Sequence, residues 1–320
     1  MTGKGRKISI LGAGNVGATI AFSLTLSGLC SEILLVDINK EKAEGEALDL
    51  IQCAAAVPSV TIRSGEYEDV KGSDVIIVTF GVGRKPGQSR LDLAKINLGI
   101  IKSVMPTVAK IAPDAVYVVV SNPVDLLTYE TIKCTGLPAS RVIGTGTLLD
   151  SNRLTQEVAA YCGVDVHNVE SYVLGEHGDA CMTPWSLCTV AGLPVKEYCK
   201  KVMKVGDEEI NSELDNIYLG MLKSGAKVIA AKGATFYAIA AATLRLLKAI
   251  FSDSGAVIPL SALLNGEYGA KDLCMGVPVL VGSSGAKKVI VLPLSPEDEK
   301  LLKEKIDSLD ATYNSLGIRE

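Results

Sequence analysis

The chain has 320 residues and a formal net charge of −4 at pH 7, with 32 Lys and Arg against 36 Asp and Glu. This length is sufficient for two domains that share an interface, and the acidic balance argues against nucleic acid or an anionic membrane as a partner. The longest apolar stretch, residues 228–251, is interrupted by Lys232, Arg245 and Lys248, so we expect no transmembrane segment.

The first predicted element is a strand at residues 8–11, followed by the turn Gly12-Ala13-Gly14-Asn15-Val16-Gly17 and an amphipathic helix over residues 18–26. Glycines at this spacing between a strand and a helix are typical of a dinucleotide site. The first permits a tight turn, the second lets the backbone approach a pyrophosphate, and the third lets the helix pack close to the strand. Free N–H groups at the helix start then face phosphate. We assign Gly12, Gly14, Asn15, Val16 and Gly17 to cofactor binding.

A second strand over residues 32–36 ends at Asp37, which lies 20 residues after Gly17. A carboxylate at this position accepts hydrogen bonds from an adenosine ribose and repels a 2′-phosphate, which favours NAD over NADP. The alternative is an ordinary glycine-rich turn with an exposed Asp37. The flanking strand, helix and acid favour the cofactor site.

Further strands are predicted at residues 60–63, 75–79, 115–120 and 142–143, separated by helical patterns. This alternation is typical of a parallel, doubly wound sheet. Two of the strands end in polar loops, Thr79-Phe80-Gly81 and Ser121-Asn122-Pro123, at the edge where such sheets bind ligands. We assign Thr79, Gly81, Val120 and Asn122 to the cofactor side of the site.

After about residue 145 the pattern changes to longer helices. Strand-like runs are predicted at residues 169–174 and 277–294, and a final amphipathic helix over residues 296–316 begins at the cap Ser295-Pro296-Glu297. The sequence therefore predicts an α/β protein. We expect a doubly wound parallel Rossmann sheet in an NAD-binding domain over residues 1–144, and an α+β substrate domain over residues 145–320.

The eight cysteines form no CxxC pair, and the chain has two histidines, so we predict no metal site. Reduced, mostly buried thiols in a cytoplasmic protein are the expectation. Although Lys4, Arg6 and Lys7 precede an apolar stretch, glycines interrupt that stretch. We therefore expect no signal peptide.

The candidate catalytic residues are those that could bind a small acid beside a nicotinamide. Asp150 and Arg153 stand three apart on a predicted helix, so both project from one face. A carbonyl that receives a hydride also needs a proton, and histidine is the side chain suited to donate it near neutral pH. Residue type leaves His167 and His177 open, and the glycines that flank His177 favour it. A helix cap for Asp150 and a surface ion pair for Arg153 are the structural alternatives.

Five motifs stand in the same order as in the L-lactate/malate dehydrogenase family, which the chain resembles over nearly its whole length. They are residues 12–17, 121–125, 144–150, 175–179 and 232–235. The resemblance implies that His177 protonates a substrate ketone, Asp150 holds the imidazole and Arg153 grips the substrate carboxylate. It implies that Arg90 polarises the carbonyl when a lid over residues 81–90 closes, that Asn122 lies near the nicotinamide and that Asn97 lies near the rim of the active site, on the cofactor side. It also implies NAD as cofactor and a homotetramer, for which a dimer is the alternative.

Substrate choice rests on five positions with opposite indications. Arg84 is typical of malate enzymes, since a second substrate carboxylate needs a cation in the closed pocket. Glu176, Trp185, and Thr235 with Ile239 resemble the lactate enzymes. We expect L-lactate dehydrogenase activity on pyruvate, with malate dehydrogenase as the alternative and turnover of both acids. A non-catalytic NAD-binding protein is a third, less favoured hypothesis.

The sequence also predicts that a sugar bisphosphate does not activate this protein. Lactate enzymes that respond to fructose 1,6-bisphosphate resemble one another in an arginine two residues after the substrate arginine and a histidine seven before the catalytic one. Here these positions hold Thr155 and Glu170. Because neither side chain suits a phosphate, we expect no activation by this sugar bisphosphate.

Overall fold

The computed structural model describes residues 5–83, 90–178 and 180–319, and of Arg90 only the backbone. Its first half is the predicted doubly wound sheet. Six strands lie in the order β3-β2-β1-β4-β5-β6, and neighbouring strands are parallel. They are β1 (Lys7–Leu11), β2 (Glu32–Val36), β3 (Thr61–Ser64), β4 (Val75–Val78), β5 (Val116–Val119) and β6 (Val142–Gly144).

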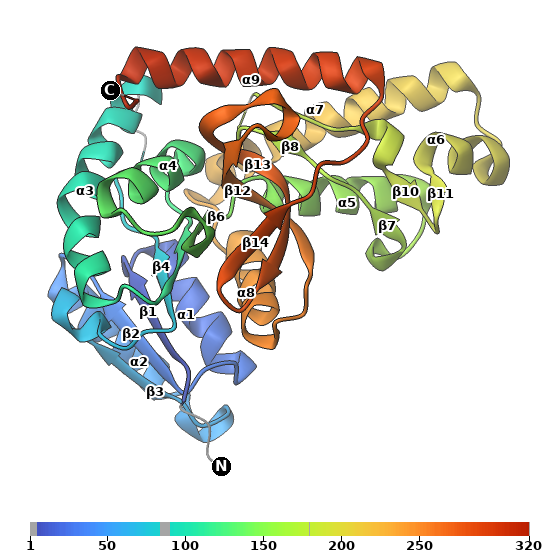
Figure 1. Ribbon diagram of the computed structural model, residues 1–320. Coiled ribbons are helices and arrows are strands. Elements are labelled where there is room, and N and C mark those ends of the chain that lie inside the picture. Colours follow the sequence, from blue (N-terminus) through green and yellow to red (C-terminus); the bar gives the residue numbers. More distant parts are fainter. Residues whose placement is uncertain (1–4, 84–89, 179, 320) are drawn as a thin grey trace.

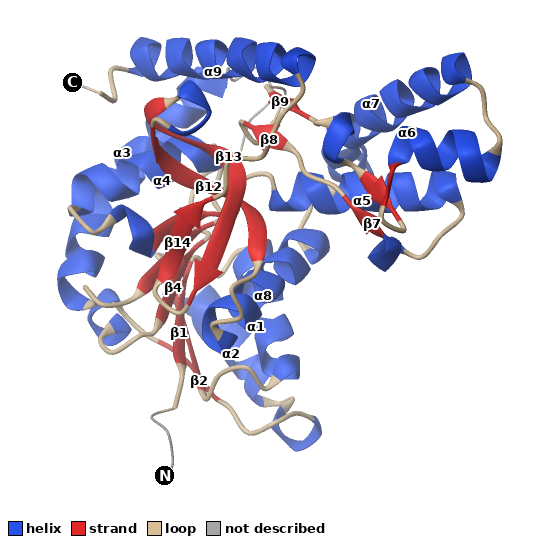
Figure 2. Ribbon diagram, turned by 45° about the vertical axis from the view of Figure 1, so that its right-hand side comes forward, coloured by secondary structure: helices blue, strands red, loops and turns tan. Residues whose placement is uncertain are grey.

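Helices cover both faces of this sheet (Figures 1 and 2). One face carries α1 (Asn15–Ser27), α2 (Lys40–Ile51) and, from the second half of the chain, α8 (Tyr237–Ser252). The other carries α3 (Arg90–Ile111) and α4 (Val124–Thr135). Because every residue of β4 and β5 is buried, a continuous apolar run is what these strands require.

The second half extends the same sheet in antiparallel fashion. Strand β12 pairs with β6, β13 with β12, β8 and β14 with β13, and β9 with β8. The strands are β8 (Leu174–Gly175), β9 (Cys181–Met182), β12 (Val257–Asn265), β13 (Lys271–Gly282) and β14 (Gly285–Val289). A separate small sheet joins β7 (Val169–Glu170), β10 (Thr189–Val190) and β11 (Leu193–Pro194).

A second hydrophobic core lies in the lobe that carries this small sheet (Figure 2). It packs α5 (Leu148–Cys162) against α7 (Asp207–Lys232), with α6 (Val195–Tyr198) beside them. Helix α9 (Pro296–Leu316) runs along the outside of the molecule (Figure 1). It has the bounds predicted from the sequence, and the Ser295 hydroxyl accepts a hydrogen bond from the Asp298 N–H at 3.1 Å.

Three predicted boundaries are wrong. The run at residues 277–294 is the end of β13 and the whole of β14, with residues 290–294 outside any strand, and β12 was not predicted. Pro259 and Pro278 face each other in the β12–β13 ladder, and a proline inside a run indicates a strand break at the sequence level. The run at residues 169–174 is two short strands that belong to different sheets. Helix α1 begins at Asn15, three residues before its predicted start.

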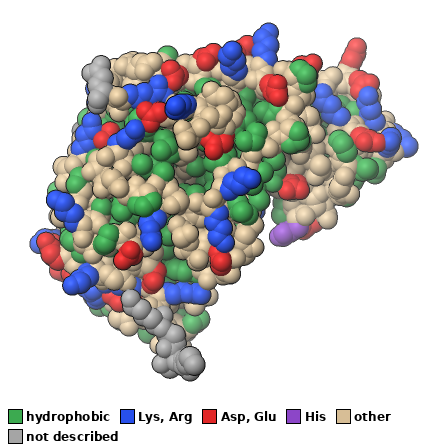
Figure 3. All heavy atoms as spheres, in the orientation of Figure 1, with side chains coloured by type: hydrophobic (Ala, Val, Ile, Leu, Met, Phe, Trp, Pro, Cys, Tyr) green, Lys and Arg blue, Asp and Glu red, His purple; other side chains and the backbone are tan. Residues whose placement is uncertain are grey.

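Sheet strands β6 and β12 pair across the predicted division at residue 144, which stays a prediction. All eight cysteines are free thiols, and six are buried. Within residues 5–83, 90–178 and 180–319 we find no helix that is long and apolar enough to pass through a bilayer. The same ranges hold no group of three or more His, Cys, Asp or Glu that could bind a metal ion. Acidic and basic side chains are interspersed over the face in Figure 3.

Candidate active site

The glycine-rich turn joins β1 to α1, and the surroundings of its three glycines differ. Gly12 has φ +109°, and a Cβ on it would lie 2.6 Å from the backbone nitrogen of Phe80. A Cβ on Gly17 would lie 1.9 Å from the Gly12 carbonyl oxygen. A Cβ on Gly14, in contrast, would meet nothing within 4 Å. The protein therefore needs two of the glycines for its own packing and leaves open space at the third.

That open space lies at the start of α1, whose cap residue Gly14 offers no side-chain hydrogen bond to the first turn. Backbone N–H groups at a helix start form a site for phosphate, and the helix dipole favours negative charge there. The turn thus fits the pyrophosphate of a dinucleotide.

Asp37 lies at the carboxyl end of β2, beside this turn. Its Oδ2 accepts a hydrogen bond from the Ala13 N–H at 2.6 Å and its Oδ1 one from the Asn39 N–H at 2.8 Å. The two bonds fix the carboxylate at the sheet edge and leave lone pairs for a ribose. The half-buried Asp37 is therefore positioned by the fold at the place predicted for it.

Asn97, on α3, connects the loops that follow β4 and β5. Its Oδ1 accepts from the Val82 N–H at 2.9 Å, and its Nδ2 donates to the Asn122 carbonyl at 2.8 Å and to the Val82 carbonyl at 3.3 Å. The side chain is buried, and its amide is occupied by these contacts. Thr79 similarly donates to the Gly12 carbonyl at 2.8 Å. Both side chains thus shape the loops around the site.

His177 stands in the tight turn between β8 and β9. The strands pair Leu174 with Met182 and Gly175 with Cys181. Gly175 ends β8 and has a φ of +100°, and Gly178, which follows His177, has a φ of +140°. Residues with a side chain rarely adopt such φ values, so the backbone itself requires the glycines that favoured His177 in the sequence.

The imidazole of His177 contacts the first turn of α5. Its Nδ1 lies 2.5 Å from Asp150 Oδ2, and Asp150 Oδ1 accepts a hydrogen bond from the Arg153 guanidinium at 3.1 Å. The three side chains are 23%, 9% and 18% exposed for His177, Asp150 and Arg153. The structure therefore brings the three predicted catalytic residues together.

Charge and burial act in opposite directions on this group. Burial lowers the pKa of His177, but the Asp150 charge and hydrogen bond, together with the Asp125 charge, outweigh it and raise the pKa above its ordinary value. Burial raises the pKa of Asp150, but the charges of His177 and Arg153 prevail and lower it. Both shifts favour a protonated imidazole beside an ionised Asp150.

Arg153 lies against α7. Gly225 on that helix is so placed that a Cβ would stand 3.5 Å from the guanidinium, which is ordinary van der Waals contact. A guanidinium in a partly dry cleft presents a planar pair of N–H groups to a carboxylate. The arrangement can thus bind a small acid and donate a proton to it.

A cavity of about 770 Å³ opens beside His177. It is walled by the start of α3, the loop before α4, the end of α7 and the last turns of α9, and it includes Asn122, Leu126, Ile229 and Thr312. The lining is the mixed apolar and polar kind that holds small molecules. Thr235 and Ile239 are half-buried near the start of α8 but do not line this cavity.

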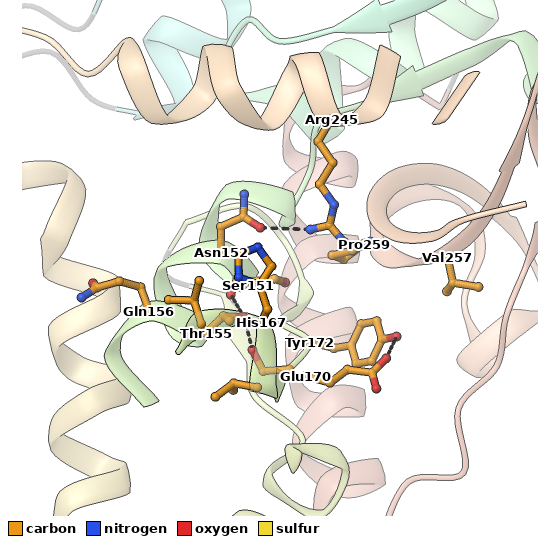
Figure 4. Close-up of a pocket in the computed structure, with 13 residues that line it drawn as sticks. Ser151, Asn152, Thr155, Gln156, His167, Glu170, Tyr172, Arg245, Val257 and Pro259 are labelled. Carbon is orange, nitrogen blue, oxygen red and sulfur yellow. Dashed lines mark hydrogen bonds between the residues drawn. The ribbon is translucent and has the colours of Figure 1, made fainter. Parts of the chain in front are cut away.

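His167, the other candidate, is excluded by its position. Its side chain is 89% exposed, and its Nδ1 lies 2.6 Å from Asp165 Oδ1. It lines a different cavity of about 620 Å³, shown in Figure 4, on the opposite side of α5. There Arg245 donates to Asn152 at 3.3 Å, and Thr155 and Glu170 point into the same space.

Two of the predicted residues fall outside this description. Arg84 lies outside the described residues, as does the side chain of Arg90.

Asp125 was missed as a candidate, although it lies in the motif 121–125. Its Oδ2 accepts a hydrogen bond from the His177 N–H at 2.8 Å. An Asp at the start of a helix is an ordinary helix-start residue, so the sequence carries no further signal for this contact.

Comparison with known proteins gives consistent matches over the chain. The family model for the lactate/malate dehydrogenase NAD binding domain matches residues 6–144, and that for the lactate/malate dehydrogenase alpha/beta C-terminal domain matches residues 147–316. The chain is 46% identical over 313 residues to L-lactate dehydrogenase 1 of Clostridium acetobutylicum, covering 96% of this chain and 99% of that protein. It is 47% identical over 302 residues to L-lactate dehydrogenase of Clostridium perfringens, covering 94% of each.

A solved structure agrees with these matches. The chain is similar to the minor L-lactate dehydrogenase from Enterococcus mundtii in its ligands-bound form, with a TM-score of 0.92 and 41% identity. The match covers 97% of this chain and 98% of that one.

The glycine turn yields a paired prediction. Gly14→Ala should fold with a stability within about 0.5 kcal/mol of the parent and weaken NADH binding by about tenfold or more, since its methyl group occupies the open space. Gly17→Ala should lose about 1–3 kcal/mol of stability, because its Cβ overlaps the Gly12 carbonyl. Urea unfolding and NADH fluorescence titration measure the two quantities.

Gly99→Ala is the matched control, because Gly99 lies within α3 and a Cβ there meets nothing within 4 Å. This variant should keep the NADH affinity and be at least as stable as the parent, since alanine is favoured over glycine inside a helix. An unchanged NADH affinity in Gly14→Ala would show that the cofactor does not approach this backbone.

Proposed function

The chain belongs to the lactate/malate dehydrogenase family, and we propose that it is an NAD-dependent L-lactate dehydrogenase, which reduces pyruvate to L-lactate. The observation that carries this proposal is the His177–Asp150–Arg153 group beside a dinucleotide turn. Its relatives named L-lactate dehydrogenase are 46% and 47% identical along nearly the whole chain. Malate dehydrogenase on oxaloacetate is the second candidate, favoured by one residue, Arg84.

The chemistry divides between cofactor and protein. When bound, NADH supplies the hydride. Protonated His177 donates its Nε2 proton to the substrate ketone oxygen, while Asp150 holds Nδ1 and stabilises the charged imidazole. The neutral imidazole then regains a proton from solvent. In the opposite direction His177 accepts the proton of the hydroxyl group.

We assign the binding and orientation of the substrate mainly to two arginines. Arg153 binds the substrate carboxylate through two parallel N–H groups, a contact that lysine does not reproduce. Arg90 polarises the ketone, and Asn122, which lines the cavity of His177, lies by the nicotinamide. Thr235, just before α8, and Ile239 on α8 are assigned to the substrate pocket, although neither lines the cavity beside His177. The roles of Arg90, Thr235 and Ile239 rest on the family resemblance alone.

The cofactor is assigned to the sheet edge. Gly12, Gly14, Asn15, Val16 and Gly17 hold the pyrophosphate at the start of α1, and Asp37 binds the adenosine ribose. The loops at Thr79, Gly81, Val120 and Asn122 bound the nicotinamide side, and Asn97 acts through the loops it joins. The carboxylate of Asp37 disfavours NADP.

We assign a homotetramer on the family resemblance. Contact with further copies of the chain is supported by large apolar side chains that are exposed on α1 and α2: Phe22, Leu26, Leu48 and Ile51. A dimer is the alternative. A cytoplasmic location is supported by the eight free thiols, because unpaired cysteines suit a reducing compartment.

The cavity in Figure 4 supports the absence of regulation by fructose 1,6-bisphosphate. Thr155 and Glu170 both line it, and the Glu170 carboxylate accepts a hydrogen bond from the Tyr172 hydroxyl at 3.0 Å. Arg245 is the cation drawn there, and it is bound to Asn152. A carboxylate beside a single engaged guanidinium is a poor host for two phosphates.

The acid–base pair gives the first test of function. Asp150→Asn should lower the pKa of His177, because the carboxylate that favours the charged imidazole is gone. The alkaline limit of pyruvate reduction then moves to lower pH. Loss of one charge-assisted hydrogen bond of about 1.5–3 kcal/mol corresponds to about a ten- to hundredfold fall in kcat/KM at neutral pH.

The assay follows NADH absorbance with pyruvate from acid to alkaline pH. His177→Asn removes the proton donor and should abolish most of the activity. His167→Asn should leave the activity intact, since His167 is exposed and lines a different cavity from His177. Pyruvate reduction by His177→Asn at the parent rate would overturn the mechanism.

Substrate choice is tested by kinetics on pyruvate and oxaloacetate with the parent and Arg84→Gln. We expect both acids to react and kcat/KM to favour pyruvate in the parent. Because one charged hydrogen bond is worth about 1.5–3 kcal/mol, the substitution should cost oxaloacetate about ten- to hundredfold and pyruvate far less. A parent that prefers oxaloacetate would reverse the order of the two candidates.

The regulatory prediction concerns saturation curves. Adding fructose 1,6-bisphosphate at millimolar concentration should leave the KM for pyruvate and the shape of its saturation curve unchanged, with inorganic phosphate as the control for ionic strength. A clear fall in KM produced by the sugar bisphosphate alone would contradict it.

A further inference from the structure

Asp125 lies in the first turn of α4, and its carboxylate holds the backbone of the turn that carries His177. Its Oδ2 accepts the His177 N–H at 2.8 Å, across 52 residues of sequence. The residue is 1% exposed. His177 is therefore held at two points: Asp150 contacts its ring, and Asp125 accepts a hydrogen bond from its backbone N–H.

The carboxylate of Asp125 is otherwise poorly satisfied. Its Oδ1 and the hydroxyl oxygen of Ser261 on β12 are both buried without a hydrogen bond of good geometry, although the Ser261 hydroxyl is near enough to lower the pKa of Asp125. The backbone carbonyl of Asp125 accepts from the Tyr313 hydroxyl of α9 at 3.3 Å, and that hydroxyl also accepts from the Cys274 N–H at 3.0 Å. The residue is thus fixed in place, while its negative charge depends on neighbouring charges.

The groups that face Asp125 come from every element around it. They are His177, Asp150 on α5, Ser261 on β12, Cys274 on β13 and Tyr313 on α9. Burial raises the pKa values of Cys274 and Tyr313 well above their ordinary range, so both stay neutral. The imidazolium of His177 supplies the positive charge.

The two carboxylates and the imidazole act on one another. Burial raises the pKa of Asp125 to about 6, with the Asp150 charge acting in the same direction and the Ser261 hydroxyl and His177 opposing them. The Asp125 charge in turn raises the pKa of His177. Because an uncompensated buried carboxylate is unfavourable, ionised Asp125 and protonated His177 favour each other.

We propose that Asp125 is a positioning residue for the reaction: it fixes the turn of His177 and supplies a second negative charge that keeps the imidazole protonated until a ketone arrives. This inference rests on the proposed function. When the Nε2 proton passes to the ketone oxygen, a neutral imidazole is left with one buried carboxylate on its ring, Asp150, and a second on its backbone, Asp125. That state favours proton uptake from water, which returns the site to its starting charge.

The test variant is Asp125→Asn, which keeps an oxygen for the His177 N–H and nearly the same volume but removes the charge. The alkaline limit of kcat/KM for pyruvate should move to lower pH. At pH 8 we expect a loss of about three- to tenfold, and at pH 5.5, where the imidazole is protonated in both proteins, less than about twofold. A loss of the same size at all pH values would mean a purely structural role and would overturn the proposal.

A second readout does not depend on turnover. The chain has two histidines, so 13C-histidine labelling yields two signals in the NADH complex. The His177 signal should titrate at lower pH in Asp125→Asn than in the parent, while the exposed His167 should not change and serves as an internal control. An unaltered His177 titration would refute the role of Asp125. Failure of the function alone would appear as a shifted titration without pyruvate reduction.

Ser261→Ala is the matched control, because it alters the same buried space and keeps the carboxylate. Since the Ser261 hydroxyl lowers the pKa of Asp125, the comparison is made at pH 8, above the pKa of about 6 for Asp125, where the control should keep kcat/KM within about twofold of the parent. If Asp125→Asn does not fold, the parent supplies the test: its His177 signal should show two inflections, its own and a smaller one from Asp125, and a single inflection would contradict the proposal.

Discussion

The site depends on one buried contact, that between His177 Nδ1 and Asp150 Oδ2 at 2.5 Å. The partners lie in different elements, so their distance is set by how α5 meets the segment that leads into β8. Two hydrogen bonds to Val173 set it: its carbonyl accepts from the Thr147 hydroxyl at 2.6 Å, and its N–H donates to Ser151 Oγ at 2.9 Å. Because both backbone groups of one residue are tied to the start of α5, the hairpin cannot slide along the helix without breaking buried hydrogen bonds.

The fold also explains how two carboxylates tolerate burial beside one imidazole. Asp150 and Asp125 each stand in the first turn of a helix, where the helix dipole favours negative charge. The remaining compensation comes from Arg153 at Asp150 and from His177 at both. A protonated imidazole is therefore part of what makes this arrangement stable, and the reactive state of the proton donor is also its resting state.

The parts of the site that the sequence could predict form short local patterns. The glycine turn between a strand and a helix, the acid at the end of β2 and the glycines around His177 can each be recognised within a short stretch of sequence, and the cap of α9 fixes its start. Contacts that depend on packing left no such pattern. The bond from the His177 N–H to Asp125 and the two loops joined by Asn97 follow from how α4, α3 and the hairpin pack. Strand β12 was missed for a related reason, since its pairing with β13 tolerates prolines that a local pattern reads as breaks.

Helix α5 contributes side chains both to the His177 group and to the cavity of Figure 4. Asp150 and Arg153 project toward His177, whereas Asn152 and Thr155 line that cavity. Asn152 binds Arg245 of α8, and Thr155 bonds to Ser171 at 2.9 Å. A charge introduced at either of these two α5 positions would act on Arg153 from within one helical turn. Because Asn152 and Thr155 are uncharged, the charged groups of this cavity, Arg245 and Glu170, stand on other elements, and the electrostatics of the proton donor depend on Asp150, Asp125 and Arg153.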